Sequence, residues 1–307
     1  MSIKKTARNN GTSFAPTGSL AREEGGFAWK LSSPLVGYVA FFLLVPIMWG
    51  IYISMTNKTI GGDASFVGFT NFANLLQDKI YVKSIRNTVE YTIFAICGKI
   101  FFGTILALIL NVDFKGNNIC RALLLIPWAL PNIAVALNWR WIFSDVGGIL
   151  NYILKSLGII QKNILWLGKA NTAMAAIIVA DVWRGVPFFG ISILAKLQTL
   201  PDDYYEAAEI DGANILQKFF KITLPWIADV IGLTTLVSTI WTINQFDTVR
   251  IMTAGGPSSA TELMNLYSYR TAMSNLQLGK GVAISVMAIP IFIILIYFAT
   301  KKSLEND

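Results

Sequence analysis

The chain has 307 residues, of which 54% are hydrophobic and 14% charged, against about 25% charged in soluble domains, so its composition indicates a membrane protein. Its net charge of +7 comes without a basic cluster interleaved with aromatic residues, which argues against a nucleic-acid partner. Histidine is absent, which removes the commonest metal ligand and the usual general base, and we predict neither a metal site nor catalytic residues.

The hydrophobic residues form long windows of the length that a membrane-spanning helix needs, about twenty residues. Six windows qualify: Pro34–Met55, Thr88–Leu110, Ala122–Trp141, Thr172–Leu194, Ile227–Gln245 and Gly281–Thr300. Pro127 and Pro131 are expected to kink the third window, which membrane helices tolerate when neighbours satisfy the freed carbonyls. We therefore predict an all-α, polytopic membrane domain over residues 34–300.

Residues 1–33 are polar and basic and contain no apolar core, so we expect a cytoplasmic N-terminal tail rather than a cleaved signal peptide. Residues 301–307 form a second tail that begins with two lysines. These lysines, and Arg121 before the third window, favour a cytoplasmic position for both termini, because positive charge accumulates on that side.

The fourth and fifth windows are separated by a polar block of helical character, DDYYEAAEIDGANILQKFFKITLPW, at residues 202–226. Asp203 and Glu206 have the spacing of a capping box, which predicts a short helix that begins at Tyr204. Gly212 suits the left-handed position just after such a helix, where a side chain would be strained.

The rest of the block predicts a second amphipathic segment, Asn214–Ile222, which Leu224-Pro225 is expected to end before the fifth window. Such a block is also typical of a membrane-surface hairpin that only holds two spans apart. Its spacing, however, resembles the EAA loop of the permease subunits of binding-protein-dependent ABC importers, over residues 195–226. The residues that carry the resemblance are Glu206, Ala207, Ala208, Gly212, Ile222, Leu224 and Pro225.

In that family the short helix is a cytoplasmic coupling helix that docks in a cleft of an ATPase subunit. The chain contains no G-x-x-x-x-G-K-[ST] sequence, so by that criterion it has no nucleotide site of its own. The resemblance therefore implies a transport subunit rather than an enzyme, without a cofactor, next to an ATPase homodimer that binds ATP and Mg²⁺. It also implies the type I ABC importer permease fold and a place in the bacterial or archaeal inner membrane.

Resemblance to the carbohydrate-uptake branch of these permeases covers nearly all of the chain from Pro34 onward. FVGFTNFANLL at 66–76, RALLLIPWALPN at 121–132 and FDTVRIMTAGGPSSAT at 246–261 carry it. The last stretch is similar to the F-type subunit of maltose importers, which implies a heterodimer with a second, G-type permease. The implied cargo is a sugar, or a related carbohydrate or polyol, that an extracytoplasmic solute-binding protein delivers.

The same subunit type implies where the cargo binds. The matching positions are Trp128, Asn132, Asp181, Arg184, Gly185, Phe188, Ser238, Thr242 and Gln245. Their helical spacings place each group on one helix face, and their aromatic, amide and hydroxyl groups suit a sugar. Several identities, Asp181 and Arg184 among them, differ from that subunit, which leaves an acidic or phosphorylated cargo, such as a uronate oligomer or a glycerol phosphate, as an alternative.

Each group also has an interpretation without cargo. The tryptophan and asparagine could pack at the proline kink, and the serine and threonine could simply allow close helix contact. Asp181 and Arg184 lie three residues apart and could neutralise each other. Lys99, inside the second window, is expected to point inward and pair with Asp181, because a lone ammonium facing lipid costs about 3 kcal/mol. That pairing would leave Arg184 available to an acidic or hydroxyl-rich cargo.

Three other classes fit the sequence less well. A secondary transporter or channel usually has repeated halves, and the sequence shows no internal repeat. A membrane enzyme needs a catalytic constellation, and neither histidine nor a cluster of carboxylates at one membrane depth occurs. Permeases for amino acids, phosphate or metals share the EAA loop, but the F-D…T-x-G-G-P stretch favours a carbohydrate.

Overall fold

The computed structural model describes residues 18–112 and 114–304. The first part of the predicted N-terminal tail, residues 1–17, and the end of the C-terminal tail lie outside the described residues. Contacts along the chain separate two units, residues 1–50 and 51–307, which are described one at a time.

The first unit consists, in its described residues, of most of helix α1 (Gly18–Ser54). The stretch Trp29–Ser54 is long and apolar enough to cross a membrane. Because the helix begins at Gly18, the described part of the predicted tail is helical and continues directly into the first predicted span. Pro34 and Pro46 lie inside α1 without ending it.

The second unit is built from helices, with one isolated β-bridge between Thr56 and Phe66 among its described residues. The longer helices are α3 (Lys79–Asn111), α6 (Asn132–Ile142), α8 (Ala170–Leu197), α11 (Leu224–Ile243) and α15 (Ile289–Leu304). The shorter elements are α2 (Thr70–Leu76), α4 (Asn117–Leu124), α5 (Ile126–Ala129), α7 (Ile149–Ser156), α9 (Asp203–Ile210), α10 (Ile215–Lys218), the π-turn η1 (Phe219–Thr223), α12 (Asp247–Met252), α13 (Met264–Tyr269), the π-turn η2 (Arg270–Ser274) and α14 (Leu278–Val286).

Span-length helices account for most of the predicted windows. Among the described residues, five stretches are long and apolar enough to cross a membrane: Trp29–Ser54, Lys79–Asn111, Ala170–Leu197, Ile215–Ile243 and Leu278–Phe298. They overlap the first, second, fourth, fifth and sixth predicted windows. The prediction of an all-α, polytopic chain is confirmed.

The third predicted window, Ala122–Trp141, is a broken element rather than a kinked helix. The segments Asn117–Ala129 and Asn132–Ile142 meet at an angle of 93°. Between them, Leu130 and Pro131 are extended, with ψ values of 142° and 139°. Proline lacks the N–H donor and disfavours a helical backbone in the residue before it, which explains why the helix breaks here.

α3 and α8 pack against each other over much of their length and form the centre of the second unit. A Cβ at Gly103 of α3 would clash with Phe189 of α8, and one at Gly190 of α8 would lie 2.7 Å from a methyl carbon of Leu106. Small residues of this kind let two membrane helices approach closely. α11 packs against both helices, so that the three surround a common interior.

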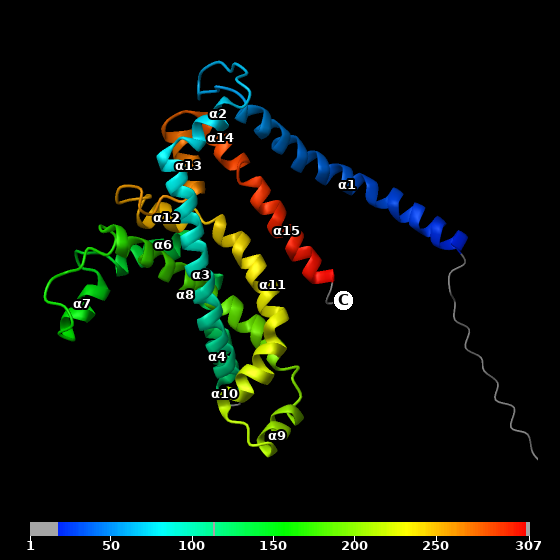
Figure 1. The fold of residues 1–307 in the computed structure, drawn as a ribbon, viewed down its shortest axis with the longest axis vertical. Coiled ribbons are helices and arrows are strands. Elements are labelled where there is room, and N and C mark those ends of the chain that lie inside the picture. The colour runs from blue at the N-terminus through cyan, green and yellow to red at the C-terminus, as the bar shows by residue number, and fades with distance from the viewer. Residues whose placement is uncertain (1–17, 113, 305–307) are drawn as a thin grey trace, which may run out of the picture. The chain divides into compact units, whose positions relative to one another are not determined.

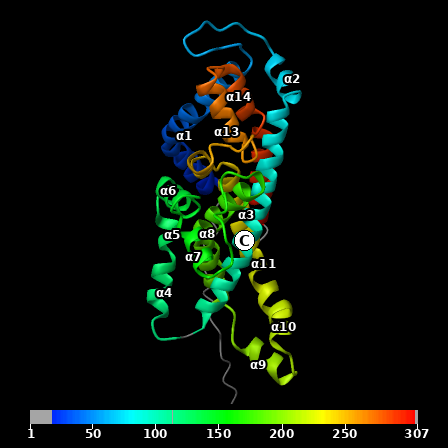
Figure 2. The ribbon, with the colours of Figure 1, turned by 90° about the vertical axis from the view of Figure 1, so that its left-hand side faces the viewer.

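The two ends of this unit carry different elements. α9 and α10 lie at the end where α3 stops and α4 begins, whereas α2, α13 and α14 lie together at the opposite end (Figures 1 and 2). α14 packs against both α2 and α13. The polar block between the fourth and fifth windows and the loops around α2 are therefore separated by the length of the bundle.

Candidate functional site

A cavity of about 390 Å³ opens between α3, α5, α6, α8 and α11. It is lined by Lys99, Trp128, Asn132, Asp181, Arg184, Gly185, Phe188, Ser238, Trp241, Thr242, Asn244 and Gln245. Every residue predicted to contact the cargo lies in this lining, although these residues come from four helices and from the turn after α11. The sequence prediction did not include Trp241 and Asn244. Their three-residue spacing from Ser238 could have identified them, because it places all three on one helix face.

An ion pair between Lys99 and Asp181 crosses the cavity wall from α3 to α8. Lys99 Nζ lies 2.7 Å from Asp181 Oδ2, and the two side chains are 5% and 6% exposed. Lys99 also donates a hydrogen bond to Thr242 Oγ1 at 2.9 Å, and Gln245 Nε2 donates one to Asp181 Oδ1 at 3.3 Å. The predicted pairing of Lys99 with Asp181 is confirmed, and it binds α11 to both other helices.

Gly185 provides the space that this pair needs. A Cβ at Gly185 would lie 2.5 Å from Lys99 Cε and 2.7 Å from Cδ, so a larger residue would displace the lysine stem. A buried ion pair stabilises a fold only when its geometry is good and its other donors and acceptors are satisfied. The hydroxyl of Thr242 and the amide of Gln245 meet that condition here.

Arg184 remains outside this network. Among the described residues, the ion-pair partner of Asp181 is Lys99 and Arg184 forms no ion pair, so the alternative in which Asp181 and Arg184 neutralise each other is wrong. Arg184 Nε and Asn132 Oδ1 are buried and have no hydrogen-bond partner in the described part of the chain. Both groups line the cavity, so it contains unused donors and acceptors.

Aromatic rings form another part of the wall. Trp128 and Phe188 are stacked with an interplanar angle of 10° and a centroid distance of 6.2 Å, and Phe188 lies 5.0 Å from the ring of Trp241. Aromatic faces next to a few convergent polar groups are typical of small-molecule sites. Such a wall suits a ligand with one apolar face and several hydroxyls.

The polar block between α8 and α11 differs in part from its prediction. α9 begins at Asp203, its N-cap residue is Asp202, and no side chain caps it, so the predicted capping box of Asp203 and Glu206 is wrong. Either of the two successive aspartates suits the N-cap position, and Asp202 occupies it. Gly212 has a φ of +76°, as predicted for the position after the helix.

The second part of the block does not end at Leu224-Pro225. α10, η1 and α11 form one continuous stretch, Ile215–Ile243, in which Pro225 lies in the first turn of α11. Proline cannot donate to the preceding turn, and a π-turn directly before it changes the hydrogen-bond register. A capping box does occur, but it is formed by Asn214 and Gln217 at the start of α10.

α9 is held to this continuous helix by specific contacts. Tyr205 Oη and Thr223 Oγ1 lie 2.8 Å apart, and Lys218 forms an ion pair with Glu209. The backbone N–H of Ala213 donates a hydrogen bond to the carbonyl of Ala208 at 2.8 Å, which stabilises the turn at Gly212. These contacts join α9 to the continuous helical stretch that carries Thr242.

The outward face of this block is apolar as well as charged. Glu206 and Ala207 are exposed on α9, and the side chains of Ile210 and Ile215 are 87% and 82% exposed. Sequence reasoning missed the two isoleucines, although apolar residues on either side of a glycine in a polar loop were a visible signal. Apolar side chains this exposed in a polar loop are candidates for contact with a partner.

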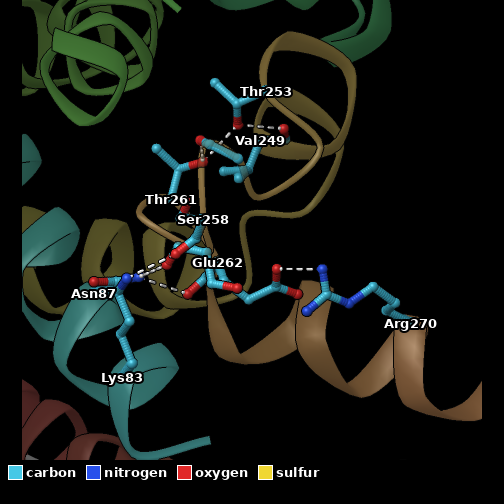
Figure 3. Close-up of polar contacts among 10 residues, drawn as sticks. Lys83, Asn87, Val249, Thr253, Ser258, Thr261, Glu262 and Arg270 are labelled. Carbon is cyan, nitrogen blue, oxygen red and sulfur yellow. Dashed lines mark hydrogen bonds and ion pairs between the residues drawn. The ribbon is translucent and has the colours of Figure 1, made fainter. Parts of the chain in front are cut away.

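At the end of the bundle opposite α9, residues 253–262 are hydrogen-bonded to α3 (Figure 3). Lys83 Nζ donates to the carbonyl of Ser258 at 2.8 Å, and Asn87 Nδ2 donates to the carbonyls of Ser259 and Glu262 at 3.0 and 3.1 Å. Glu262 is fully buried, and its Oε2 lies 2.9 Å from Nη1 of Arg270. Burial raises the pKa of the Glu262 carboxyl, and the charge of Arg270 opposes that effect.

Comparison with known proteins places the chain among transport proteins. Residues 99–301 match the model of a family described as binding-protein-dependent transport system inner membrane component. The chain is 35% identical over 273 residues to the trehalose/maltose transport system permease protein MalF of Thermococcus litoralis, which covers 88% of this chain and 91% of that protein. It is also 35% identical over 259 residues to the sulfoquinovosyl glycerol transport system permease protein SmoG of Agrobacterium fabrum, which covers 84% of this chain and 83% of that protein.

Solved structures share the fold. A chain of a bacterial alginate ABC transporter, in complex with an alginate pentasaccharide-bound periplasmic protein, superposes with a TM-score of 0.76 at 19% identity, over 93% of this chain and 96% of that one. A second structure, of a bacterial ABC transporter involved in the import of the acidic polysaccharide alginate, gives 0.75 at 21% identity, over 94% and 97%.

Proposed function

The chain belongs to the family of binding-protein-dependent transport system inner membrane components, and we propose that it forms, with a second permease, the translocation pathway of an ATP-driven ABC importer for a carbohydrate or polyol. It is a multi-pass inner membrane protein and a non-enzymatic subunit. The observation that carries the proposal is the cavity, whose lining includes the aromatic rings of Trp128, Phe188 and Trp241 and the unused polar groups of Asn132 and Arg184.

The cargo class rests on the relatives and on the chemistry of the cavity. The two relatives named above transport, by their names, trehalose or maltose and sulfoquinovosyl glycerol. Stacked aromatic rings offer a surface to the C–H face of a sugar ring, while amide and guanidinium groups bond its hydroxyls. Ser238, Thr242 and Gln245 complete the contacts from α11 and the turn that follows it.

An acidic carbohydrate is a second candidate, and Arg184 favours it. The charges of Lys99 and Asp181 offset each other. Among the described residues of the lining, Arg184 therefore contributes one uncompensated positive charge. Arginine donates two parallel hydrogen bonds to a carboxylate, sulfonate or phosphate group.

The proposed partners are a G-type permease, an ATPase homodimer and an extracytoplasmic solute-binding protein. ATP and Mg²⁺ bind to the ATPase, and this chain contributes no cofactor site. The coupling residues are those of the block after α8, of which Glu206, Ala207 and the exposed Ile210 and Ile215 form the docking face. This assignment puts α9 and both termini in the cytoplasm.

The proposed cycle is mechanical. The binding protein delivers cargo at the end that carries α2, α13 and α14, and ATP closes the ATPase dimer at the other end. α9 moves with the ATPase and pulls on α11 through the contact of Tyr205 with Thr223. Because Thr242 on α11 accepts a hydrogen bond from Lys99 on α3, that motion reshapes the cavity directly.

The test is purification of the tagged chain from its native membranes in mild detergent, followed by reconstitution into proteoliposomes. We expect co-purification of a second permease and a P-loop ATPase in a 1:1:2 ratio of the three chains, and ATP-dependent uptake of a radiolabelled carbohydrate once the binding protein is added. A chain that purifies alone or self-paired, without an ATPase, would overturn the proposal and reopen the secondary-transporter alternative.

A further inference from the structure

A second, polar pocket lies at the end of the bundle opposite the coupling block. It has a volume of about 360 Å³ and is lined by side chains of the loop after α1, of α2 and of the start of α14, among them Asn57, Lys58, Asn74, Gln277 and Lys280. α2 and α14 lie side by side at this end (Figures 1 and 2). The proposed function does not use this pocket.

The walls of the pocket are fixed by backbone contacts. The N–H of Gly279 donates to the carbonyl of Lys58 at 2.9 Å, and the N–H of Ile60 donates to the carbonyl of Leu276 at 3.0 Å. On the other side, Asn71 Nδ2 donates to the carbonyls at residues 54 and 56, at 2.8 Å each. The pocket is thus preformed, so an occupant would not have to order a loose loop.

The charge in the pocket is positive. Lys280 Nζ lies 2.9 Å from Oδ2 of Asp78, which also accepts a hydrogen bond from the Tyr267 hydroxyl at 2.7 Å. Lys58 Nζ donates to the carbonyl of Gly62 at 2.6 Å and forms no ion pair within the described part of the chain. One lysine is therefore balanced by a carboxylate and the other is not.

The neighbouring amides are unused. Asn74 and Gln277 make no side-chain hydrogen bond among the described residues, and both are exposed in the wall. Two amide donors and an ammonium around one concave site suit a group that only accepts hydrogen bonds and carries negative charge. A carboxylate is such a group, and charge-assisted hydrogen bonds to it are the stronger kind.

From this geometry we infer that the pocket receives an aspartate or glutamate side chain of the solute-binding protein, with Lys58 as its charge partner. The inference rests on the proposed function, because it needs a binding protein that docks at this end. The pocket is far from α9 and opens where cargo arrives, and its charge selects an acidic partner surface. Such contacts mainly set the rate of encounter and the choice of partner.

The experiment measures ATP hydrolysis by the complete importer in nanodiscs of purely zwitterionic lipid, so that an anionic headgroup cannot fill the pocket. The binding protein, loaded with its cargo, is titrated against wild type, Lys58→Glu and Asn74→Asp. We expect the half-saturating concentration to rise roughly fivefold to tenfold in both variants, the size expected for a partly exposed charge contact, while the maximal rate is kept. Lys79→Glu is the matched control, since Lys79 is exposed at the same end but does not line the pocket.

A second measurement identifies the partner group. Carbodiimide joins an amine to a carboxylate without a spacer, so wild type should give a crosslink from Lys58 to an acidic residue of the binding protein, and Lys58→Gln should not. An unchanged half-saturating concentration in Lys58→Glu, or a shift equal to that of Lys79→Glu, would overturn the inference. Failure of the proposed function would look different, because wild type itself would then show no stimulation by the binding protein.

Discussion

Lys99 and Asp181 lie 82 positions apart in the sequence (181 − 99), yet their charged atoms are separated by 2.7 Å inside the bundle. Each charge alone would be costly at this depth, and together they fasten α3 to α8 at the wall of the cavity. Thr242 adds α11 to the same contact. The pair therefore links α3, α8 and α11, three of the helices that line the cavity.

Removal of one partner should destabilise the protein strongly. We expect Lys99→Met to lower the free energy of unfolding by about 3–5 kcal/mol, because Asp181 would then be a buried charge without a partner. Lys99→Met combined with Asp181→Asn should recover most of that loss. Thermal unfolding of the detergent-solubilised protein measures both, and a single variant as stable as wild type would contradict the expectation.

The positions expected to contact cargo were predicted from the resemblance to a known permease subunit, and two physical constraints support them. Helical spacing fixes which side chains share a face, and the cost of an unpaired ammonium in a membrane directs Lys99 to an acidic group. Trp241 was missed because it is not among the positions that the resemblance implies. Its three-residue spacing from Ser238 places it on the lining face.

Other features depend on long-range structure and could not be predicted. Pro225 predicts a helix break from local rules, but the π-turn before it keeps the helix continuous. The hydrogen bond that Thr242 accepts from Lys99 needs two helices to meet at one level, which no periodicity reveals. The start of α9 was ambiguous for a local reason instead, because both Asp202 and Asp203 suit an N-cap position.

Substitutions in the block at residues 202–226 should uncouple ATP hydrolysis from transport. Glu206→Arg reverses a charge on the exposed face of α9, and Gly212→Val strains a residue with a φ of +76°. We expect both to lower the ratio of cargo transported to ATP hydrolysed by roughly tenfold, with normal membrane insertion. The ratio is measured in proteoliposomes.

A matched control exists for the glycine. Gly158 has a φ of +70° with open space around it, so Gly158→Val introduces similar backbone strain in the loop after α7, away from the block. Its coupling ratio should equal that of wild type. Unchanged uptake in both Glu206→Arg and Gly212→Val would exclude the coupling role.

The end of the bundle that carries α2, α13 and α14 should lose stability in acid through Asp78. Burial alone would raise the pKa of its carboxyl, but hydrogen bonds from Tyr267 and Lys280 lower the pKa to about 2. A carboxyl whose pKa is lowered in the folded state stabilises the protein at pH values above its ordinary pKa of 3.8. This stabilisation is lost as the pH falls from about 4 towards 2.

The comparison is between wild type and Asp78→Asn. We expect wild type to be more stable by an amount on the order of 1 kcal/mol at pH 7, and the difference to shrink between pH 4 and pH 2. Thermal unfolding across that range measures it. A difference that is constant with pH would show that Asp78 acts only through its shape.

Arg184 should decide between acidic and neutral cargo. It has no ion-pair partner among the described residues, so Arg184→Gln should lower uptake of an acidic carbohydrate by at least about tenfold, whereas uptake of a neutral one should change by less than about threefold. Arg184→Lys should keep part of the acidic uptake, because it keeps the charge but loses the paired donors. Arg140→Gln, at an exposed arginine of α6, is the control. The measurement is uptake of digalacturonate against maltose, and equal losses for the two would contradict the expectation and leave Arg184 as a general hydroxyl contact.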